Sequence, residues 1–96
     1  MFAVVNHLHF DRPVEEFRAA VASEGMPLLA KQPGFRDFYL VKEAEDRGIV
    51  IIFWEDAASA VAGAQAFGPT WFNEHIIPYL VSPQQRSAGE VLVSHH

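Results

Sequence analysis

The sequence predicts an α+β fold of the ferredoxin-like type, a βαββαβ unit with a four-stranded antiparallel sheet and two helices on one face. Residues 2–10 alternate between two kinds of side chain, residues 49–54 are all apolar, and a stretch with helical spacing follows each of these strands. The 96 residues contain no internal linker, repeat or low-complexity segment. We therefore expect a single domain over residues 1–96.

The first predicted strand, residues 2–10, divides its side chains between two faces. Phe2, Val4, Asn6, Leu8 and Phe10 share one face, and the residues between them share the other. We expect the first set to face the helices. An unpaired amide is costly to bury among apolar side chains, so Asn6 needs a hydrogen-bond partner or a ligand.

The first helical stretch follows this strand directly. Asp11 or Arg12 is expected to cap it, and Pro13 stands in its first turn. Gly25 and Pro27 then interrupt the apolar spacing, which resumes before the next turn. Because proline removes a helical donor and clashes with the preceding turn, we expect a kinked or two-piece helix.

The next two strands form a predicted hairpin. Residues 35–43 and 49–54 read as strands, joined by the polar turn 44–48. Six consecutive apolar residues at 49–54 are typical of a strand that is covered on both faces. Helices cover only one face of such a sheet, and the other would expose a large apolar patch. We therefore expect a homodimer that packs sheet against sheet.

The second helical stretch begins after Asp56, which is placed to cap it. Gly68 and Pro69 are expected to break this helix, and Pro78 to end the segment that restarts beyond them. A loop rich in Ser, Pro, Gln and Gly follows. Residues 90–94 then read EVLVS, and we expect the last strand there.

The composition argues against several classes of function. The chain has no cysteine, so it has no disulfide framework, thiol nucleophile or thiolate metal site. Seven Lys and Arg against twelve Asp and Glu, without a basic cluster, argue against nucleic acid as a partner and against an RNA-recognition domain of the same strand order. No apolar run approaches the ~20 residues that span a bilayer, and no signal-peptide pattern opens the chain. We expect a cytoplasmic protein without a membrane partner.

Four segments carry a family resemblance. They are the N-terminal strand with Asn6, the PGF turn at 33–35, the FWED junction at 53–56 and the PTWF segment at 69–72. With these segments the chain resembles the dimeric α+β barrel superfamily, and within it the antibiotic biosynthesis monooxygenase (ABM) type domains. The resemblance implies a dimer whose sheets pack face to face, with a pocket in each subunit between the sheet and the second helix. Members include cofactor-free oxygenases, haem-degrading enzymes and proteins without known activity.

The resemblance also supplies the candidate catalytic residues, which are Asn6, Trp71 and His75. They are similar to an Asn in the first strand and a Trp and a His in the second helix of haem-degrading members. Here Trp71 and His75 are only four residues apart, on one helical stripe, and residues 63–65, where many relatives carry a His, have none. His75 would act as a base or as a donor to a bound anion, and its alternative interpretation is a half-buried surface histidine.

Aromatic and apolar residues of the strands and the second helix are the candidate substrate-binding set: Leu8, Tyr39, Trp54, Phe67 and Phe72. Two further histidines, His7 and His9, have a spacing that allows two metal ligands on one strand face. No acidic residue follows them in register. We therefore expect them at the dimer interface and expect no metal site.

These observations favour a cofactor-independent monooxygenase that encloses an apolar aromatic molecule, such as a quinol or a polyketide. The resemblance implies that the enolate or phenolate of the substrate supplies electrons to dioxygen, while Asn6, Trp71 and His75 orient it and donate or accept hydrogen bonds. The alternative is a non-catalytic dimeric module that binds a small molecule or haem in the same pocket. Haem is the one cofactor that the sequence leaves open.

Overall fold

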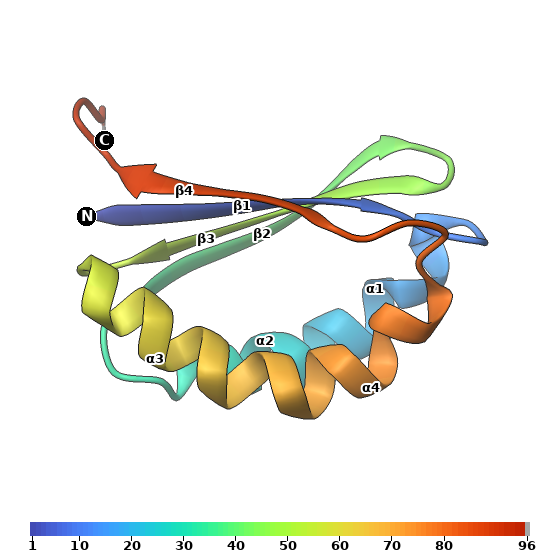
Figure 1. Ribbon diagram of the computed structural model, residues 1–96, viewed down its shortest axis with the longest axis horizontal. Helices are drawn as coiled ribbons and strands as arrows, with labels where there is room; N and C mark the ends of the chain where they lie inside the picture. The colour runs from blue at the N-terminus through green and yellow to red at the C-terminus, as the bar shows by residue number, and fades with distance from the viewer. Residues whose placement is uncertain (96) are drawn as a thin grey trace.

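The computed structural model describes residues 1–95 and confirms the ferredoxin-like α+β fold. The strand order is β2-β3-β1-β4, and all neighbouring strands are antiparallel. The four strands are β1 (Phe2–His9), β2 (Phe35–Ala44), β3 (Arg47–Trp54) and β4 (Gln85–Glu90). Both helical stretches lie on the same side of this sheet, and the opposite side carries no helix (Figure 1).

The inner face of the sheet is set by the alternation predicted for β1 and β3. Val4 and Leu8 of β1 are buried, as are Val50, Ile52 and Trp54 of β3. The antiparallel register brings the two sets together, because Val4 pairs with Ile52. These residues form the centre of the hydrophobic core, against which the helices pack.

The outer face of the sheet is apolar at its centre, and His7, Asp37 and Ser87 lie around this apolar area on the same face. It carries side chains from three neighbouring strands: Ala3, Val5, Tyr39, Val41, Ile49, Ile51 and Phe53. Tyr39 is 52% exposed and Val41 is 40% exposed, whereas the three residues of β3 are half-buried by their neighbours. Within one chain the β3 strand is thus covered fully on one face only.

The first helical stretch covers residues 14–30 and is irregular, as predicted. It comprises a 3₁₀ turn (Val14–Phe17), α1 (Arg18–Ala20), a π-helical turn (Val21–Gly25) and α2 (Met26–Ala30). The predicted cap is wrong. Pro13 occupies the N-cap position without a side-chain cap, and Asp11 instead accepts a hydrogen bond of 2.7 Å from Arg12. Proline has no side-chain oxygen to accept a hydrogen bond, but its fixed φ begins the turn, and its backbone carbonyl accepts from the Glu16 N–H at 3.1 Å.

The second helical stretch begins as predicted and continues where a break was expected. It comprises α3 (Ala57–Phe67), a π-helical turn (Gly68–Phe72), α4 (Asn73–His75) and a 3₁₀ turn (Ile77–Tyr79). Asp56 Oδ1 accepts a hydrogen bond of 2.8 Å from the Ser59 N–H, and this bond lowers the pKa of the Asp56 carboxyl. Pro69 does not end the helix, because the wider π-helical turn accommodates it. Thr70 Oγ1 also donates to the Ala66 carbonyl at 2.7 Å.

The prediction for the last strand is wrong in position. The sequence favoured residues 90–94, but β4 is Gln85–Glu90, and all six of its residues are exposed. It pairs with β1 at the edge of the sheet, with Asn6 opposite Arg86. An edge strand of this kind needs little apolar surface, so the apolar run that follows it gave a misleading signal. Leu92 and Val93 lie beyond the strand and are exposed.

Close packing of α3 on the sheet depends on the absence of a side chain at Gly63. A Cβ built at Gly63 would overlap the ring of Trp54, which is 1% exposed and lies at the end of β3. Phe35 packs edge-on against the same ring, with centroids 5.8 Å apart. None of the helices in residues 1–95 combines the length and apolar character required to cross a membrane.

Gly63→Ala is therefore expected to destabilise the protein by about 1–3 kcal/mol, because the added methyl group must displace Trp54 or α3. Gly68→Ala is the matched control: a Cβ there meets nothing within 4 Å, and the residue already has helical dihedral angles. The control should be neutral or stabilise by about 0.5–1 kcal/mol. Urea denaturation measures both. Equal effects of the two substitutions would contradict the role assigned to Gly63.

Candidate functional site

A pocket lies between the inner face of the sheet and the two helical stretches. The space free of protein atoms amounts to about 840 Å³ when the open side of the pocket is included. The part of this space that the centre of a water molecule can occupy is about 110 Å³. The lining comes from β1, β2, β3, both helical stretches and the start of β4.

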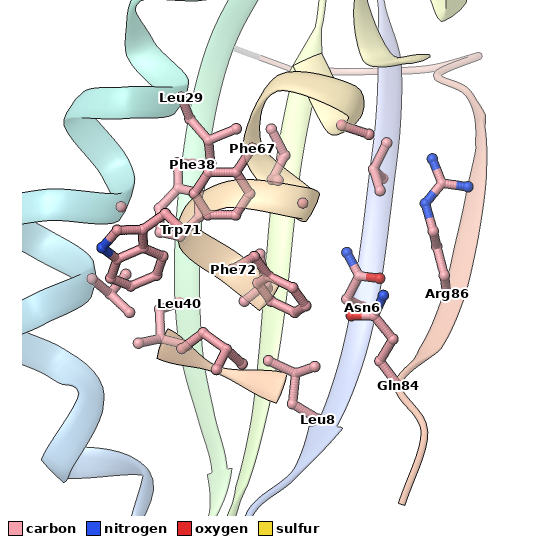
Figure 2. Close-up of a pocket in the computed structure, with 18 of the residues that line it drawn as sticks. Asn6, Leu8, Leu29, Phe38, Leu40, Phe67, Trp71, Phe72, Gln84 and Arg86 are labelled. Atoms are coloured by element: carbon pink, nitrogen blue, oxygen red, sulfur yellow. The ribbon is translucent and has the colours of Figure 1, made fainter. Parts of the chain in front are cut away.

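Most of the lining is apolar. Figure 2 shows Phe67, Trp71 and Phe72 of the second helical stretch grouped with Leu29, Phe38 and Leu40 in the apolar part of the lining. Phe67 stacks on Trp71 with ring centroids 5.7 Å apart and an interplanar angle of 26°. Aromatic and branched aliphatic walls of this type are typical of pockets that take small organic molecules.

Trp71 is held at the point where the two π-helical turns meet. A Cβ at Gly25 would lie 2.8 Å from the ring of Trp71, so the bare backbone there lets the indole approach the first helical stretch. Trp71 Nε1 donates to Glu24 Oε1 at 3.1 Å, and the ring of His75 stacks on the indole with centroids 4.9 Å apart. π-Helical turns inside helices often accompany functional sites, and here they aim one aromatic ring into the pocket.

Of the eight predicted site residues, six line the pocket: Asn6, Leu8, Trp54, Phe67, Trp71 and Phe72. Tyr39 does not. It lies on the outer face of the sheet, where its ring meets Phe53 edge-on at 6.3 Å. The prediction placed Tyr39 among ligand contacts because it is aromatic, but strand alternation gives the inner face to Phe38 and Leu40.

His75 is also outside the pocket lining. It is half-buried, and its ring stacks on that of Trp71 with an interplanar angle of 28°. No other histidine within residues 1–95 lines the pocket. Haem iron is also bound by Cys, Met or Tyr in other proteins, and none of these lines the pocket within residues 1–95, so the lining itself supplies no side-chain ligand of these types.

The polar part of the lining is small and lies on the β1–β4 side. It consists of Asn6, Gln84 and Arg86, as Figure 2 shows. Asn6 Oδ1 and Gln84 Oε1 are buried, and neither has a hydrogen-bond partner within residues 1–95. The sequence did not point to Gln84 and Arg86, because its apolar pattern placed the last strand too late in the chain. Had the strand been predicted at 85–90, the alternation of its side chains, continued back to residue 84, would have put Gln84 and Arg86 on the same face of the sheet as Asn6.

His7 and His9 belong to a different hollow, lined also by Glu43, Arg47 and Gln85. His9 Nε2 lies 3.0 Å from Asp46 Oδ2, and this hydrogen bond lowers the pKa of the Asp46 carboxyl. The sequence did not indicate an acidic partner for His9; in the structure this partner is Asp46, which lies in the turn between β2 and β3. In the part of the chain that the structure describes, no three His, Asp or Glu side chains are grouped to hold a metal ion.

The comparison with protein families identifies the chain. The profile described as antibiotic biosynthesis monooxygenase matches residues 1–65. The chain belongs to this family. The ABM match includes Asn6 and the FWED junction and ends inside α3, before the segment that carries Trp71. The comparison with curated proteins finds no match.

Solved structures with the same fold extend over the whole ABM chain. SnoaB, a cofactor-independent oxygenase from Streptomyces nogalater, is 18% identical with a TM-score of 0.79, over 97% of this chain and 94% of that one. MhuD, a haem degrader from Mycobacterium tuberculosis, is 20% identical with a TM-score of 0.72, over 100% of both chains. A protein of unknown function from Nitrosomonas europaea is 18% identical with a TM-score of 0.77, over 99% of this chain and 92% of that one. At these identities the likeness establishes the fold.

The contact between Trp71 and Glu24 can be tested directly. Glu24→Ala is expected to lower the free energy of unfolding by about 1 kcal/mol, because the indole N–H loses its acceptor. Glu24→Gln keeps an acceptor oxygen and should retain most of the stability. Glu16→Ala removes an exposed acidic side chain of the same helical stretch and serves as the control, with an expected change below about 0.5 kcal/mol. Equal loss in Glu24→Gln and Glu24→Ala would show that charge, and not this hydrogen bond, matters.

Proposed function

We propose that this ABM protein is a cofactor-independent monooxygenase whose substrate is an apolar aromatic small molecule of the quinol or polyketide type. The observation that carries the proposal is the pocket itself: an apolar, largely aromatic cavity with one polar end, in a chain of this family. SnoaB, which has the same fold, is a cofactor-independent oxygenase. Such a pocket buries a planar ring system and leaves its oxygen substituents at the polar end.

The reaction uses the electrons of the substrate. An acidic carbon or hydroxyl of the aromatic loses a proton, and the resulting carbanion or phenolate reduces dioxygen. In the simplest balanced form a ring CH₂ group and O₂ give a ring C=O group and H₂O. One oxygen atom enters the product, and the other leaves as water with the two hydrogens of the CH₂ group.

The protein contributes position and environment to this reaction. The rings of Trp71, Phe67 and Phe72 exclude water and fix the plane of the substrate. The amide of Asn6 offers a hydrogen-bond acceptor in a region of low polarity, where such a bond is strong. His75 acts through Trp71, against which it stacks, and is a positioning residue in this proposal.

A second candidate function follows from the groups that the pocket lacks. Among residues 1–95, no histidine or carboxylate side chain lines it, so the chain supplies no general base there. This observation favours a non-catalytic module that binds the same kind of molecule. The monooxygenase and the binding module differ in one respect only. In the monooxygenase, a bound aromatic that is acidic enough to lose a proton without a protein base reacts with dioxygen.

Oxygen consumption separates the two candidates. The purified protein is incubated in air-saturated buffer with a panel of anthrones and naphthohydroquinones. We expect uptake above that of buffer with at least one of them, an oxygenated product and no hydrogen peroxide, since two-electron oxidation to a quinone would release peroxide. Asn6→Leu and Trp71→Leu should each lower kcat/KM about tenfold or more.

Two further variants control this experiment. Arg36→Gln alters an exposed arginine outside the pocket and should leave the activity unchanged. His75→Phe keeps a flat ring against Trp71 and should retain activity that His75→Ala loses, mainly through KM, as expected for a positioning residue. No uptake above buffer with any member of the panel would remove the monooxygenase and leave the binding module.

We also propose that the protein forms a homodimer through the outer face of its sheet. This face is apolar across three strands and is left open by the helices. At micromolar concentration, sedimentation should give about twice the 10.7 kDa of one chain. Ile51→Glu places a charge at the centre of the face and should give monomers. Val61→Glu, at an exposed position of α3, should not. A stable species of one chain mass for the unaltered protein would contradict the proposal.

A further inference from the structure

His7 lies on the outer face of the sheet, which the helices leave open (Figure 1). On β1 it follows Ala3 and Val5 as the third side chain that points to this face. Its neighbours in the same row are Ile49 on β3 and Gln85 on β4. Residues that pair directly across antiparallel strands have Cβ atoms about 4.5–5.5 Å apart. A partner that covers Ile49 therefore also covers His7.

The occupant that this face fits is a second copy of the chain. Its apolar area spans three strands and three rows of side chains, which corresponds to about 300 Å² at the usual spacings of a sheet. A specific interface covers about 500 Å² or more of each partner. A second copy brings the same apolar area, and the contact has to extend over β4 to reach this size. His7 lies between the apolar area and β4, so the homodimer proposed above encloses it.

The ionisable groups around His7 leave its charge without a counterpart. Arg47 of β3 and Glu43 of β2 line the same hollow and have opposite charges. His9, the next residue of β1 on this face, is hydrogen-bonded to Asp46 at 3.0 Å. The other side chains that line the hollow carry no charge. Within residues 1–95 the imidazole of His7 forms no hydrogen bond or ion pair.

We propose that His7 makes the homodimer sensitive to pH, so that the dimer is stable while His7 is neutral and dissociates when His7 gains a proton. Histidine is the side chain that ordinarily changes its charge between about pH 5 and 8. In the free chain His7 is exposed to water, whereas in the dimer it is enclosed beside Ile49 without a counter-ion. Burying a charge without a partner is unfavourable. The protonated form of His7 is therefore favoured in the free chain.

The direction of the pH dependence follows from this difference. Because two free chains bind more protons than one dimer, lowering the pH shifts the equilibrium towards the free chains. A two-fold dimer contains His7 twice, so both copies take up a proton when the dimer dissociates, and the effect is steeper than for a single group. The inference rests on the proposed homodimer and adds its regulation.

Sedimentation equilibrium measures the dissociation constant of the dimer at about pH 8 and about pH 5.5, at one ionic strength. For the unaltered chain we expect this constant to rise about tenfold or more at the lower pH. His7→Gln keeps a polar side chain that cannot gain a proton, and its dissociation constant should change by less than about threefold. His7→Lys carries a charge at both pH values and should give a weak dimer at both.

Two further substitutions test the assignment to His7. His75→Gln removes a histidine that stacks on Trp71 in the second helical stretch, and it should retain the pH dependence of the unaltered chain. His9→Gln removes the neighbouring histidine, whose charge Asp46 balances, and should retain most of it. If the dimer is too tight to dissociate at measurable concentrations, every comparison is made in the Val41→Ala background, which removes apolar contact from the same face. Circular dichroism at both pH values confirms that the chains are folded.

Three results would overturn the inference. They are equal dissociation constants of the unaltered chain at both pH values, a tighter dimer at the lower pH, and a pH dependence that persists in His7→Gln. A tighter dimer would show that a carboxylate of the second copy, for example that of Asp37, lies against His7. Failure of the proposed homodimer has a different signature. In that case the unaltered chain has the mass of one chain at both pH values, which removes the homodimer and its regulation together.

Discussion

The position of β1 between β3 and β4 is the constraint on which the rest of the structure depends. Its register with β3 decides that Val4 and Leu8 face the helices and that Val5 faces away. Because side chains alternate along a strand, a slip of one residue would exchange the two faces completely. It would put Asn6 on the outer face and His7 in the core. The core, the pocket and the apolar outer face thus all follow from this one alignment.

The sequence was sufficient for elements whose residues are buried. Alternation in β1 and the apolar run of β3 predicted both strands and the inward position of Asn6, because burial enforces these patterns. It was insufficient for β4, in which every residue is exposed and no apolar pattern is needed. The same error hid Gln84 and Arg86. The apolar part of the candidate site was therefore predictable, and the polar part that depends on an edge strand was not.

The helical stretches show a different limit of prediction from the sequence. Gly68 and Pro69 predicted a break, yet the chain continues through a π-helical turn, in which the Thr70 hydroxyl donates to the Ala66 carbonyl. A local pattern identifies the irregularity but not the tertiary contact that selects its form. Here that contact is Trp71 on Gly25, and each of these two residues lies in a π-helical turn. The aromatic wall of the pocket is thus a product of packing between stretches that are distant in sequence.

The polar end of the pocket opposes stability. Two buried acceptors that have no partner among the described residues cost about 1–3 kcal/mol each, against a total of about 5–15 kcal/mol for a typical domain. Leucine at position 6 would continue the apolar face formed by Val4 and Leu8 and would remove one of these costs. Destabilising groups of this kind concentrate where a protein binds or reacts, since a ligand that pairs with them recovers the loss. Asn6, Gln84 and Arg86 all line an otherwise apolar cavity, and within residues 1–95 the two amide oxygens have no hydrogen-bond partner, so a ligand that pairs with them would recover this cost.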